Sequence, residues 1–322
     1  MIIRFGYVAM STMVKNASPS RTMTVTNFNK LTDREAAIRK LERLGAENIH
    51  NSLRLLRHNR AHDIHVFRFS SKLIPLFGHE MLEDWDPITV LAEDFKELGN
   101  YVKENQMRVS FHPDHFTVLS TPKKDVLKKS VEDLQRHSAM LNAMGLGSES
   151  LCNIHVGGIY GDKPKAGERF VQQFSDMRTE IQKRITLEND DKTFTALETL
   201  EIAEQVSTPM VLDVHHHQVN NNGEDAAKLW PRIAETWKRE DLAGLPPKIH
   251  VSSPKSEKDP RSHADYVEAE PLYRFFKEIA PITPRLDVMI EAKMKDGALV
   301  QLMEDLKSLS GVTALNQASI EM

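Results

Sequence analysis

The sequence has one cysteine, a small net charge and no long apolar run, and each shortage excludes a class of protein. Cys152 alone cannot form an internal disulfide, which fits a reducing cytoplasm. A net charge of −4 gives no general attraction to nucleic acid, so DNA binding would need a local basic face or bound metal ions. No run approaches the about 20 apolar residues of a membrane span, and no charged-then-apolar leader opens the chain. We therefore expect a soluble cytoplasmic protein.

Histidine, in contrast, is abundant, with 14 copies, and its imidazole is the commonest transition-metal ligand in proteins. The clearest cluster lies in residues 209–218, where an apolar run of strand type ends in Asp213 and three consecutive histidines. Asp213 and His216 are three residues apart, so a short turn after the strand would aim both side chains at one cation. Several other short apolar runs also end in His or Glu, and this repetition indicates a shared site.

The alternation of apolar runs and amphipathic stretches predicts about eight strand–helix units, the number in a TIM barrel. The predicted strands are residues 2–8, 66–69, 107–111, 151–154, 185–187, 209–212, 248–251 and 286–290. We expect one TIM (β/α)8 barrel domain over residues 1–322. A doubly wound open sheet is the alternative, but its site would gather at one switch point, whereas ligand-type residues end nearly every run here.

Four local features accompany this pattern. The polar residues 9–30 predict a long loop after the first strand. Thr32 and Glu35 have the spacing of a capping box at the start of a helix, with a second helical stretch over residues 49–60. Residues 165–184 read as one helix. We expect residues 253–263 to form no more than an insertion at the surface.

Strand ends converge on one pocket at the carboxyl-terminal rim of a barrel, so the residues at these positions form a candidate metal site. They are His79, His112, His155, Glu188, Asp213, His216, His250, His263 and Glu291. Nine nitrogen and oxygen donors exceed the needs of one tetrahedral ion and suit two or three divalent cations. A carboxylate such as Glu188 can bridge two ions about 3.5–4 Å apart, an arrangement suited to phosphoryl chemistry.

Seven segments together resemble the UV damage endonuclease family in the right order over nearly the whole chain. They are Arg4-Phe5-Gly6-Tyr7-Val8, Arg68-Phe69-Ser70-Ser71, Ser110-Phe111-His112-Pro113, Asn153-Ile154-His155-Val156-Gly157-Gly158, Leu187-Glu188-Asn189-Asp190, Asp213-Val214-His215-His216 and Ile290-Glu291-Ala292-Lys293. The resemblance implies a TIM barrel related to endonuclease IV. It also implies metal-dependent, ATP-independent incision of damaged double-stranded DNA immediately 5′ to cyclobutane pyrimidine dimers, 6-4 photoproducts and abasic sites.

The resemblance assigns roles to single residues. It implies that the nine candidate ligands hold the metals and that Lys248 is a lysine that can be carboxylated beside them. It places Tyr7 near the lesion. His115 and Phe116 stand where members of the family often carry a Gln-Tyr pair that wedges into the duplex. We expect Mn²⁺ as the cofactor, with Mg²⁺, Zn²⁺ or Co²⁺ as alternatives, and a monomer as the active form.

Other functions fit parts of the pattern. A metal-dependent sugar isomerase also sets His, Glu and Asp on barrel strand ends, but it has no use for an aromatic wedge. A non-enzymatic metal- or DNA-binding module ranks last, because nine convergent ligands exceed the needs of a structural ion. For phosphate contacts, the candidate residues are Lys15, Arg21, Lys163 and Lys165.

Overall fold

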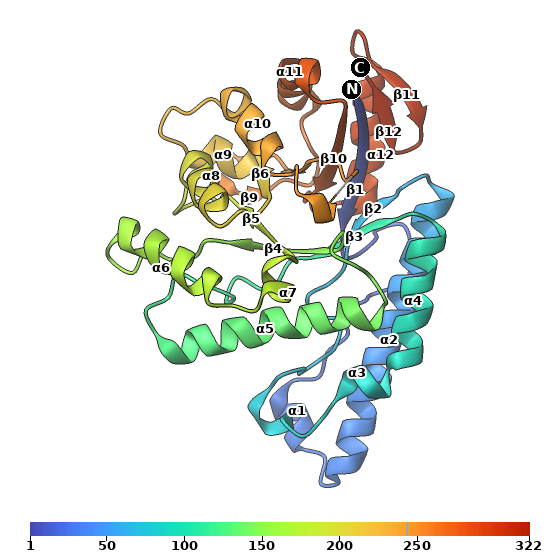
Figure 1. The fold of residues 1–322 in the computed structure, drawn as a ribbon. Helices are drawn as coiled ribbons and strands as arrows, with labels where there is room; N and C mark the ends of the chain where they lie inside the picture. Colours follow the sequence, from blue (N-terminus) through green and yellow to red (C-terminus); the bar gives the residue numbers. More distant parts are fainter. Residues whose placement is uncertain (243) are drawn as a thin grey trace.

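Short runs of buried residues form the strands of a closed barrel. The computed structural model describes residues 1–242 and 244–322. Within these residues, eight parallel strands pair in chain order, and the last of them pairs with the first (Figure 1). The strands are β1 (Ile2–Val8), β2 (Val66–Arg68), β3 (Arg108–Phe111), β4 (Leu151–His155), β5 (Ile185–Glu188), β6 (Met210–Asp213), β7 (Lys248–Val251) and β10 (Arg285–Ile290). The predicted TIM barrel is confirmed, and the open sheet is excluded.

Helices follow the strands and surround the barrel (Figure 1). They are α1 (Val25–Asn29), α2 (Arg34–Ala61), α3 (Pro87–Val90), α4 (Ala92–Glu104), α5 (Lys124–Ala143), α6 (Lys163–Ser175), α7 (Thr179–Gln182), α8 (Ala196–Gln205), α9 (Val214–Val219), α10 (Ala226–Glu235), α11 (Ala269–Ile279) and α12 (Lys295–Lys307). Short 3₁₀ turns form η1 (Glu80–Leu82), η2 (Glu240–Leu242) and η3 (Ala280–Ile282). Among the described residues, no helix combines the length and apolar character needed to cross a membrane.

Two antiparallel hairpins extend the barrel. The first joins β8 (Pro254–Ser256) to β9 (Asp259–His263), and the second joins β11 (Thr313–Asn316) to β12 (Ser319–Glu321). Strand β12 pairs with β1, and the amino group of Met1 donates to the carbonyl of Met322 at 2.5 Å. Residues 253–263 form the first hairpin at the surface, as an insertion between β7 and α11, and this hairpin brings His263 and Arg261 to the barrel mouth.

Several predictions about helix boundaries differ from the structure. Asp33, not Thr32, caps α2, because the Asp33 carboxylate accepts from the amide of Ala36 at 3.2 Å. Helix α2 then continues through both stretches that were predicted as separate helices. Residues 165–184 form α6 and α7 instead of one helix. The predicted long loop contains α1, whose first turn is capped by Thr24.

A buried ion-pair network links three barrel strands. Asp287 of β10 accepts from Arg4 of β1 at 2.7 Å and from Arg108 of β3 at 2.8 Å. The Arg4–Asp287 pair joins the two strands that close the barrel, whose register sets Arg4 opposite Asp287. Because Asp287 is fully buried, removing either arginine would leave a charge without full compensation.

Gly6 allows β1 and β2 to approach closely. A Cβ atom at Gly6 would lie 2.0 Å from the carbonyl oxygen of Val66, which is the strand partner of Gly6. Backbone atoms in a paired strand cannot move aside without breaking the ladder. The position therefore requires glycine.

We predict that Gly6→Ala lowers the free energy of unfolding by about 3 kcal/mol or more, because the added methyl group overpacks the sheet. Gly167→Ala is the matched control. Its Cβ would lie 3.4 Å from Ile202 Cδ1, an ordinary contact, and alanine favours the helix by up to about 1 kcal/mol. Denaturant unfolding at fixed pH measures both variants. Equal effects of the two substitutions would contradict the close approach of β1 and β2.

Candidate metal centre

A cavity of about 770 Å³ opens at the carboxyl-terminal ends of the barrel strands. The strand periodicity carries polar side chains to this rim. His155, Glu188 and Asp213 are the last residues of β4, β5 and β6. His112 and Glu291 directly follow β3 and β10, and His250 lies within β7. His112, His155, His216 and His263 line the cavity, and the carboxylates lie buried beneath them.

The carboxylate of Glu188 lies at the centre of these side chains and is almost fully buried. Its Oε2 is 3.2 Å from Nε2 of His112 and accepts a hydrogen bond from the amide of Asn153. Its Oε1 is 3.2 Å from Nδ1 of His250 and 3.6 Å from Nδ1 of His216. One carboxylate therefore contacts imidazoles from β7, from α9 and from the end of β3.

Four groups of side chains bring their ligand atoms within 4.8 Å of one another, and Glu188 belongs to three of them. The groups are His112, His155 and Glu188; Glu188, Asp213 and His216; Glu188, His250 and Glu291; and His215, His216 and His263. The sharing of Glu188 agrees with the bridging role that the sequence suggested. The fourth group includes His215, which sequence reasoning did not select.

Four imidazoles of the cluster are oriented through the same ring nitrogen. Nδ1 of His112, His155, His216 and His263 lies 2.8–3.2 Å from the backbone carbonyl oxygen of Pro113, Glu188, Asn189 and Glu291, respectively. Because a carbonyl oxygen only accepts, Nδ1 of each ring carries a proton, and Nε2 is the nitrogen that would face a ligand. Metal-binding histidines are typically held in this way, with the second nitrogen donating to an acceptor behind the site.

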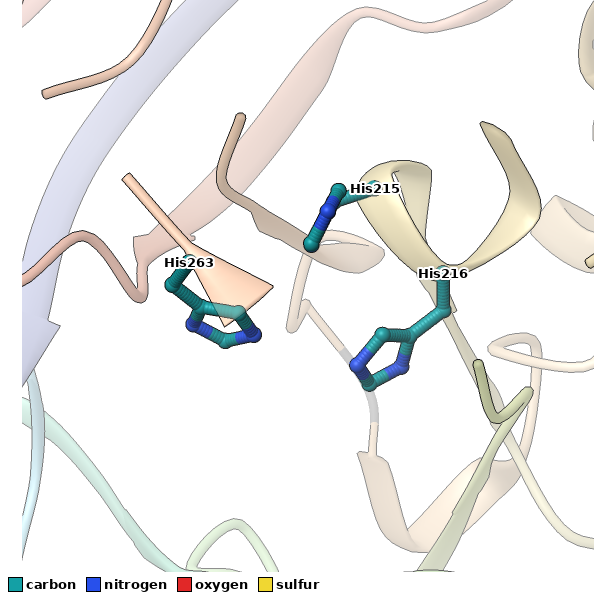
Figure 2. A group of neighbouring side chains, drawn as sticks. All are labelled: His215, His216 and His263. Carbon is teal, nitrogen blue, oxygen red and sulfur yellow. The ribbon is translucent and has the colours of Figure 1, made fainter. Parts of the chain in front are cut away.

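The three consecutive histidines differ in the ring nitrogen that contacts a backbone carbonyl. Asp213 caps α9 by accepting from the amide of His216 at 2.7 Å, which turns His216 toward the cluster. His215 and His217 instead place Nε2 at the carbonyl oxygens of Pro260 and Glu224, at 2.7 and 3.1 Å. Figure 2 shows His215 and His216 on α9, with His263 on the neighbouring hairpin strand. Within this run, His216 is therefore the residue whose Nε2 is free for a ligand.

Glu291 is held from the opposite side of the cluster. Arg68, at the end of β2, donates to Oε1 of Glu291, and Nδ1 of His250 lies 3.0 Å from the same oxygen. Burial alone would raise the pKa of Glu291, but the charges of Arg68 and His250 hold it well below its usual range. Glu291 is thus a carboxylate that stays ionised although it is mostly buried.

The pKa values of the other two carboxylates, Glu188 and Asp213, are shifted in opposite directions. Burial would raise the pKa of Glu188, but the imidazoles of His250 and His155 hold it well below its usual range. Burial, together with the charges of Glu188 and Glu291, raises the pKa of Asp213 to about 6 despite His216 nearby. Burial would lower the pKa of His216, but Asp213 and Glu188 raise it to about 9. Despite burial, the carboxylates raise the pKa of His216 and of His250, so protons on these two imidazoles balance part of the buried negative charge.

Several buried atoms of the cluster have no hydrogen-bond partner within the described residues. They are Oε1 of Glu188, Oδ2 of Asp213 and both ring nitrogens of His250. His250 Nδ1 approaches two carboxylate oxygens but without hydrogen-bond geometry. Buried polar atoms without partners are costly unless a ligand satisfies them. A mixed set of imidazoles and carboxylates with such atoms fits divalent transition metals.

Other predicted site residues lie outside this cluster. Tyr7 is fully buried, and its hydroxyl donates to Oδ1 of Asn59 at 2.6 Å. His79 caps η1 through Nδ1, which accepts from the amide of Met81 at 3.3 Å. Neither residue belongs to the four ligand groups of the described chain. Their roles near the lesion and the metals stay predictions.

The residues expected to contact phosphate are mostly engaged elsewhere. Arg21 pairs with Glu47, Lys163 with Glu198 and Lys165 with Asp162, at 2.6, 2.6 and 2.9 Å. None of these three, nor Lys15, lines the cavity in the described part of the chain. Sequence reasoning also missed the roles of Asn153 and Arg68, although both lie in the conspicuous segments 153–158 and 68–71.

We predict that Mn²⁺ binds more tightly as the pH rises from about 6 to 9. Asp213 and His216 hold protons below their raised pKa values, and a cation must displace them, so binding releases protons. Calorimetric titration at pH 7 in two buffers of different ionisation enthalpy measures this release. His216→Gln should reduce it, whereas the neighbouring control His217→Gln should not. An affinity independent of pH in the wild type would contradict the prediction.

Known proteins resemble the chain over nearly its whole length. The family model of the UV-endonuclease UvdE matches residues 3–322. The UV DNA damage endonucleases of Halalkalibacterium halodurans and Bacillus mycoides are 43% and 40% identical to the chain, over 100% of it and over 99% and 100% of their own lengths. The crystal structure of SacUVDE has a TM-score of 0.82 at 28% identity and covers 95% of this chain and 98% of its own.

More distant structures share the fold alone. A 3-keto-D-glucoside 4-epimerase from E. coli has a TM-score of 0.54 at 10% identity, covering 95% of this chain and 100% of its own. The family model, in contrast, spans nearly every residue, and the curated relatives align over the full chain. The chain therefore belongs to the UV-endonuclease UvdE family.

Proposed function

We propose that the chain is a DNA repair endonuclease that incises damaged double-stranded DNA immediately 5′ to the lesion, with two or three divalent cations as cofactors. The observation that carries the proposal is the position of Glu188, which three ligand groups share at the barrel mouth. Membership of the family supports an endonuclease acting on DNA. Cyclobutane pyrimidine dimers, 6-4 photoproducts and abasic sites are the proposed substrates, and Mn²⁺ is the proposed cation.

The ligand groups would offer two kinds of donor atom to the cations, imidazole nitrogens and carboxylate oxygens. His112, His155, His216 and His263 would offer Nε2, because Nδ1 of each donates to a backbone carbonyl. Glu188, Asp213 and Glu291 would offer carboxylate oxygens. When bound, divalent cations neutralise a phosphodiester, lower the pKa of water and stabilise the leaving oxygen. The proposed role of the protein side chains is to fix these donors, with Asn153 orienting Glu188 and Arg68 orienting Glu291.

Recognition of the lesion is proposed to involve the loop after β3. Phe116 is 72% exposed, and its ring centroid lies 4.0 Å from that of His115. The two residues that flank Phe116, His115 and Thr117, line the cavity, so this exposed ring lies at its edge. A damaged base pair stacks poorly and is extruded at lower cost than a normal pair, and an aromatic side chain can fill the gap. His115 lines the cavity, so this loop lies beside the proposed cation site.

The sugar isomerase alternative has no support beyond the fold. The epimerase neighbour shares the barrel at an identity that carries no functional argument. An exposed aromatic loop beside the cavity also suits a polymeric substrate better than a small closed sugar site. The assay that tests the proposal is nicking of UV-irradiated plasmid by the Mn²⁺-loaded protein, with unirradiated plasmid as control. Absence of lesion-dependent nicks would overturn it.

Glu188→Gln should reduce incision at least about 100-fold, because the loss of one charge weakens several ligand groups at once. Binding to a lesion-containing duplex should change little, since Glu188 is buried away from the DNA-facing loops. Glu180→Gln, on exposed α7, is the matched control and should keep the wild-type rate. A Glu188→Gln protein that nicks irradiated DNA at near the wild-type rate would refute the shared role of Glu188.

Phe116→Ala should weaken binding to a dimer-containing duplex by about 1–3 kcal/mol, the usual contribution of one base–aromatic stack. Incision at an abasic site should suffer less, because no damaged base needs to be extruded there. Ile282→Ala is a suitable control, since this exposed residue precedes β10 at the opposite end of the barrel. Fluorescence anisotropy measures the affinities, and equal losses on both substrates would argue against a wedge.

We further propose that Lys248 is carboxylated in the metal-loaded protein. Burial, with the charges of Arg108 and Arg68, lowers the pKa of Lys248 to about 7, so much of the amine is neutral at neutral pH. A neutral amine adds carbon dioxide and releases one proton, giving an anionic carbamate whose oxygens suit a cation. Nζ donates to Ser110 Oγ at 3.3 Å, and Lys248 lies two residues before His250.

Incision should therefore fall on acidification below about pH 7 and partly recover with added bicarbonate. Lys248→Ala should show no bicarbonate response. Nuclear magnetic resonance with ¹³C-bicarbonate should detect a carbamate carbon in the wild type and none in the variant. The carboxylation proposal fails if the metal-loaded wild type gives no such signal.

A further inference from the structure

The β8–β9 hairpin carries a positively charged side chain, that of Arg261, which the proposed mechanism does not use. Arg261 is exposed and lines the same cavity as His112, His155, His216 and His263. Arg261 and His263 are two residues apart on β9, so their side chains leave the strand on the same face. Figure 2 shows His263 beside His215 and His216, with which it forms one ligand group, and Arg261 lines the cavity next to His263.

Arg261 lies among charged side chains of both signs that line the cavity. Among the described lining residues, Lys192 and Arg261 carry the fixed positive charges, and Asp114, Asp190 and Asp191 carry negative ones. Asp190 accepts hydrogen bonds from its own loop, including the amides of Lys192 and Phe194 at 2.9 and 3.0 Å. Arg261 makes no ion pair with any described carboxylate, so its guanidinium is available to an anion from solution.

A buried histidine fixes the backbone beside Arg261. Nε2 of His215 donates to the carbonyl oxygen of Pro260 at 2.7 Å, directly before Arg261. The imidazole of His215 also packs edge-on against that of His263, with ring centroids 5.2 Å apart. At the end of the hairpin, the amide of Ala264 donates to the carbonyl of Ser253 at 2.8 Å. The hairpin is therefore held to α9 through His215, and the bond between Ala264 and Ser253 closes its base.

We infer that Arg261 binds a backbone phosphate of the DNA substrate and that His215 is the positioning residue that holds it over the cavity. The inference rests on the proposed function, because the anion that it assigns is a phosphodiester. A guanidinium matches phosphate with two parallel N–H donors, which a lysine cannot reproduce. His215 is oriented through Nε2, opposite to the four histidines held through Nδ1, and this orientation places its donor at the backbone beside Arg261.

The test measures kcat/KM for incision of a duplex with one cyclobutane thymine dimer, using Mn²⁺-loaded protein over a series of NaCl concentrations. Arg261→Gln should lower kcat/KM about 10- to 100-fold, as expected for a charged hydrogen-bonded contact. It should also reduce the slope of log kcat/KM against log salt by about one, the signature of one lost phosphate contact. Arg261→Lys should keep the slope but recover only part of the rate.

Lys258→Gln is the matched control, since it removes one exposed positive charge from the turn of the same hairpin. It should leave the rate near that of the wild type. His215→Ala should lower the rate as Arg261→Gln does, and the double variant should add little to either loss. His215→Gln should rescue, because its amide can still donate to Pro260. Metal content is measured for every variant, so that a damaged cation site is recognised.

The outcomes separate the two proposals. Wild-type incision together with an Arg261→Gln variant that keeps the wild-type rate and salt slope would overturn the phosphate contact and leave the endonuclease proposal standing. Equal losses in Arg261→Gln and Lys258→Gln would also overturn it, since the effect would then be one of general charge. Fully additive losses for His215→Ala and Arg261→Gln would overturn the positioning role. A wild type that makes no incision would overturn both proposals.

Discussion

The arrangement at the barrel mouth depends on one buried carboxylate that several imidazoles share. An ionised carboxylate away from water is costly unless opposite charges and hydrogen bonds compensate it. Glu188 has both: His112 and His250 approach it at 3.2 Å, and Asn153 donates to it. Protons on His216 and His250 balance part of this charge, and bound cations would replace them. The carboxylate of Glu291 is compensated in the same way by Arg68 and His250, whereas burial raises the pKa of Asp213 to about 6.

Rigid elements hold the cluster, and loops surround it. The ligand side chains arise from strand ends and from the first turn of α9, and their second nitrogens are fixed by backbone carbonyls. A site built on such elements keeps its geometry while the loops around it vary. The loop with Phe116 and the β8–β9 hairpin lie at the rim, where an extended substrate would meet them. The barrel would thus separate the chemistry, in its mouth, from the reading of DNA, at its edge.

The sequence predicted the barrel and the strand-end residues because buried parallel strands are continuous apolar runs and their ends converge. It did not predict the β8–β9 hairpin, whose residues are mostly polar and whose position depends on a hydrogen bond from His215 of α9 to the backbone of Pro260. The predicted helix boundaries were wrong where one side chain caps the helix, as Asp33 does at the start of α2. Phosphate candidates chosen from loop position were mostly paired with carboxylates, because ion pairs between distant segments leave no local pattern. The orientation of the consecutive histidines likewise depends on carbonyl groups that no sequence spacing indicates.

The central claim is that one buried carboxylate organises more than one cation. Diffraction at the manganese absorption edge, from crystals grown with Mn²⁺, tests it most directly. The account predicts at least two anomalous peaks that both contact Glu188, one beside His112 and His155 and another beside His250 and Glu291. A single peak, or peaks that leave the carboxylate of Glu188 without a cation, would contradict it.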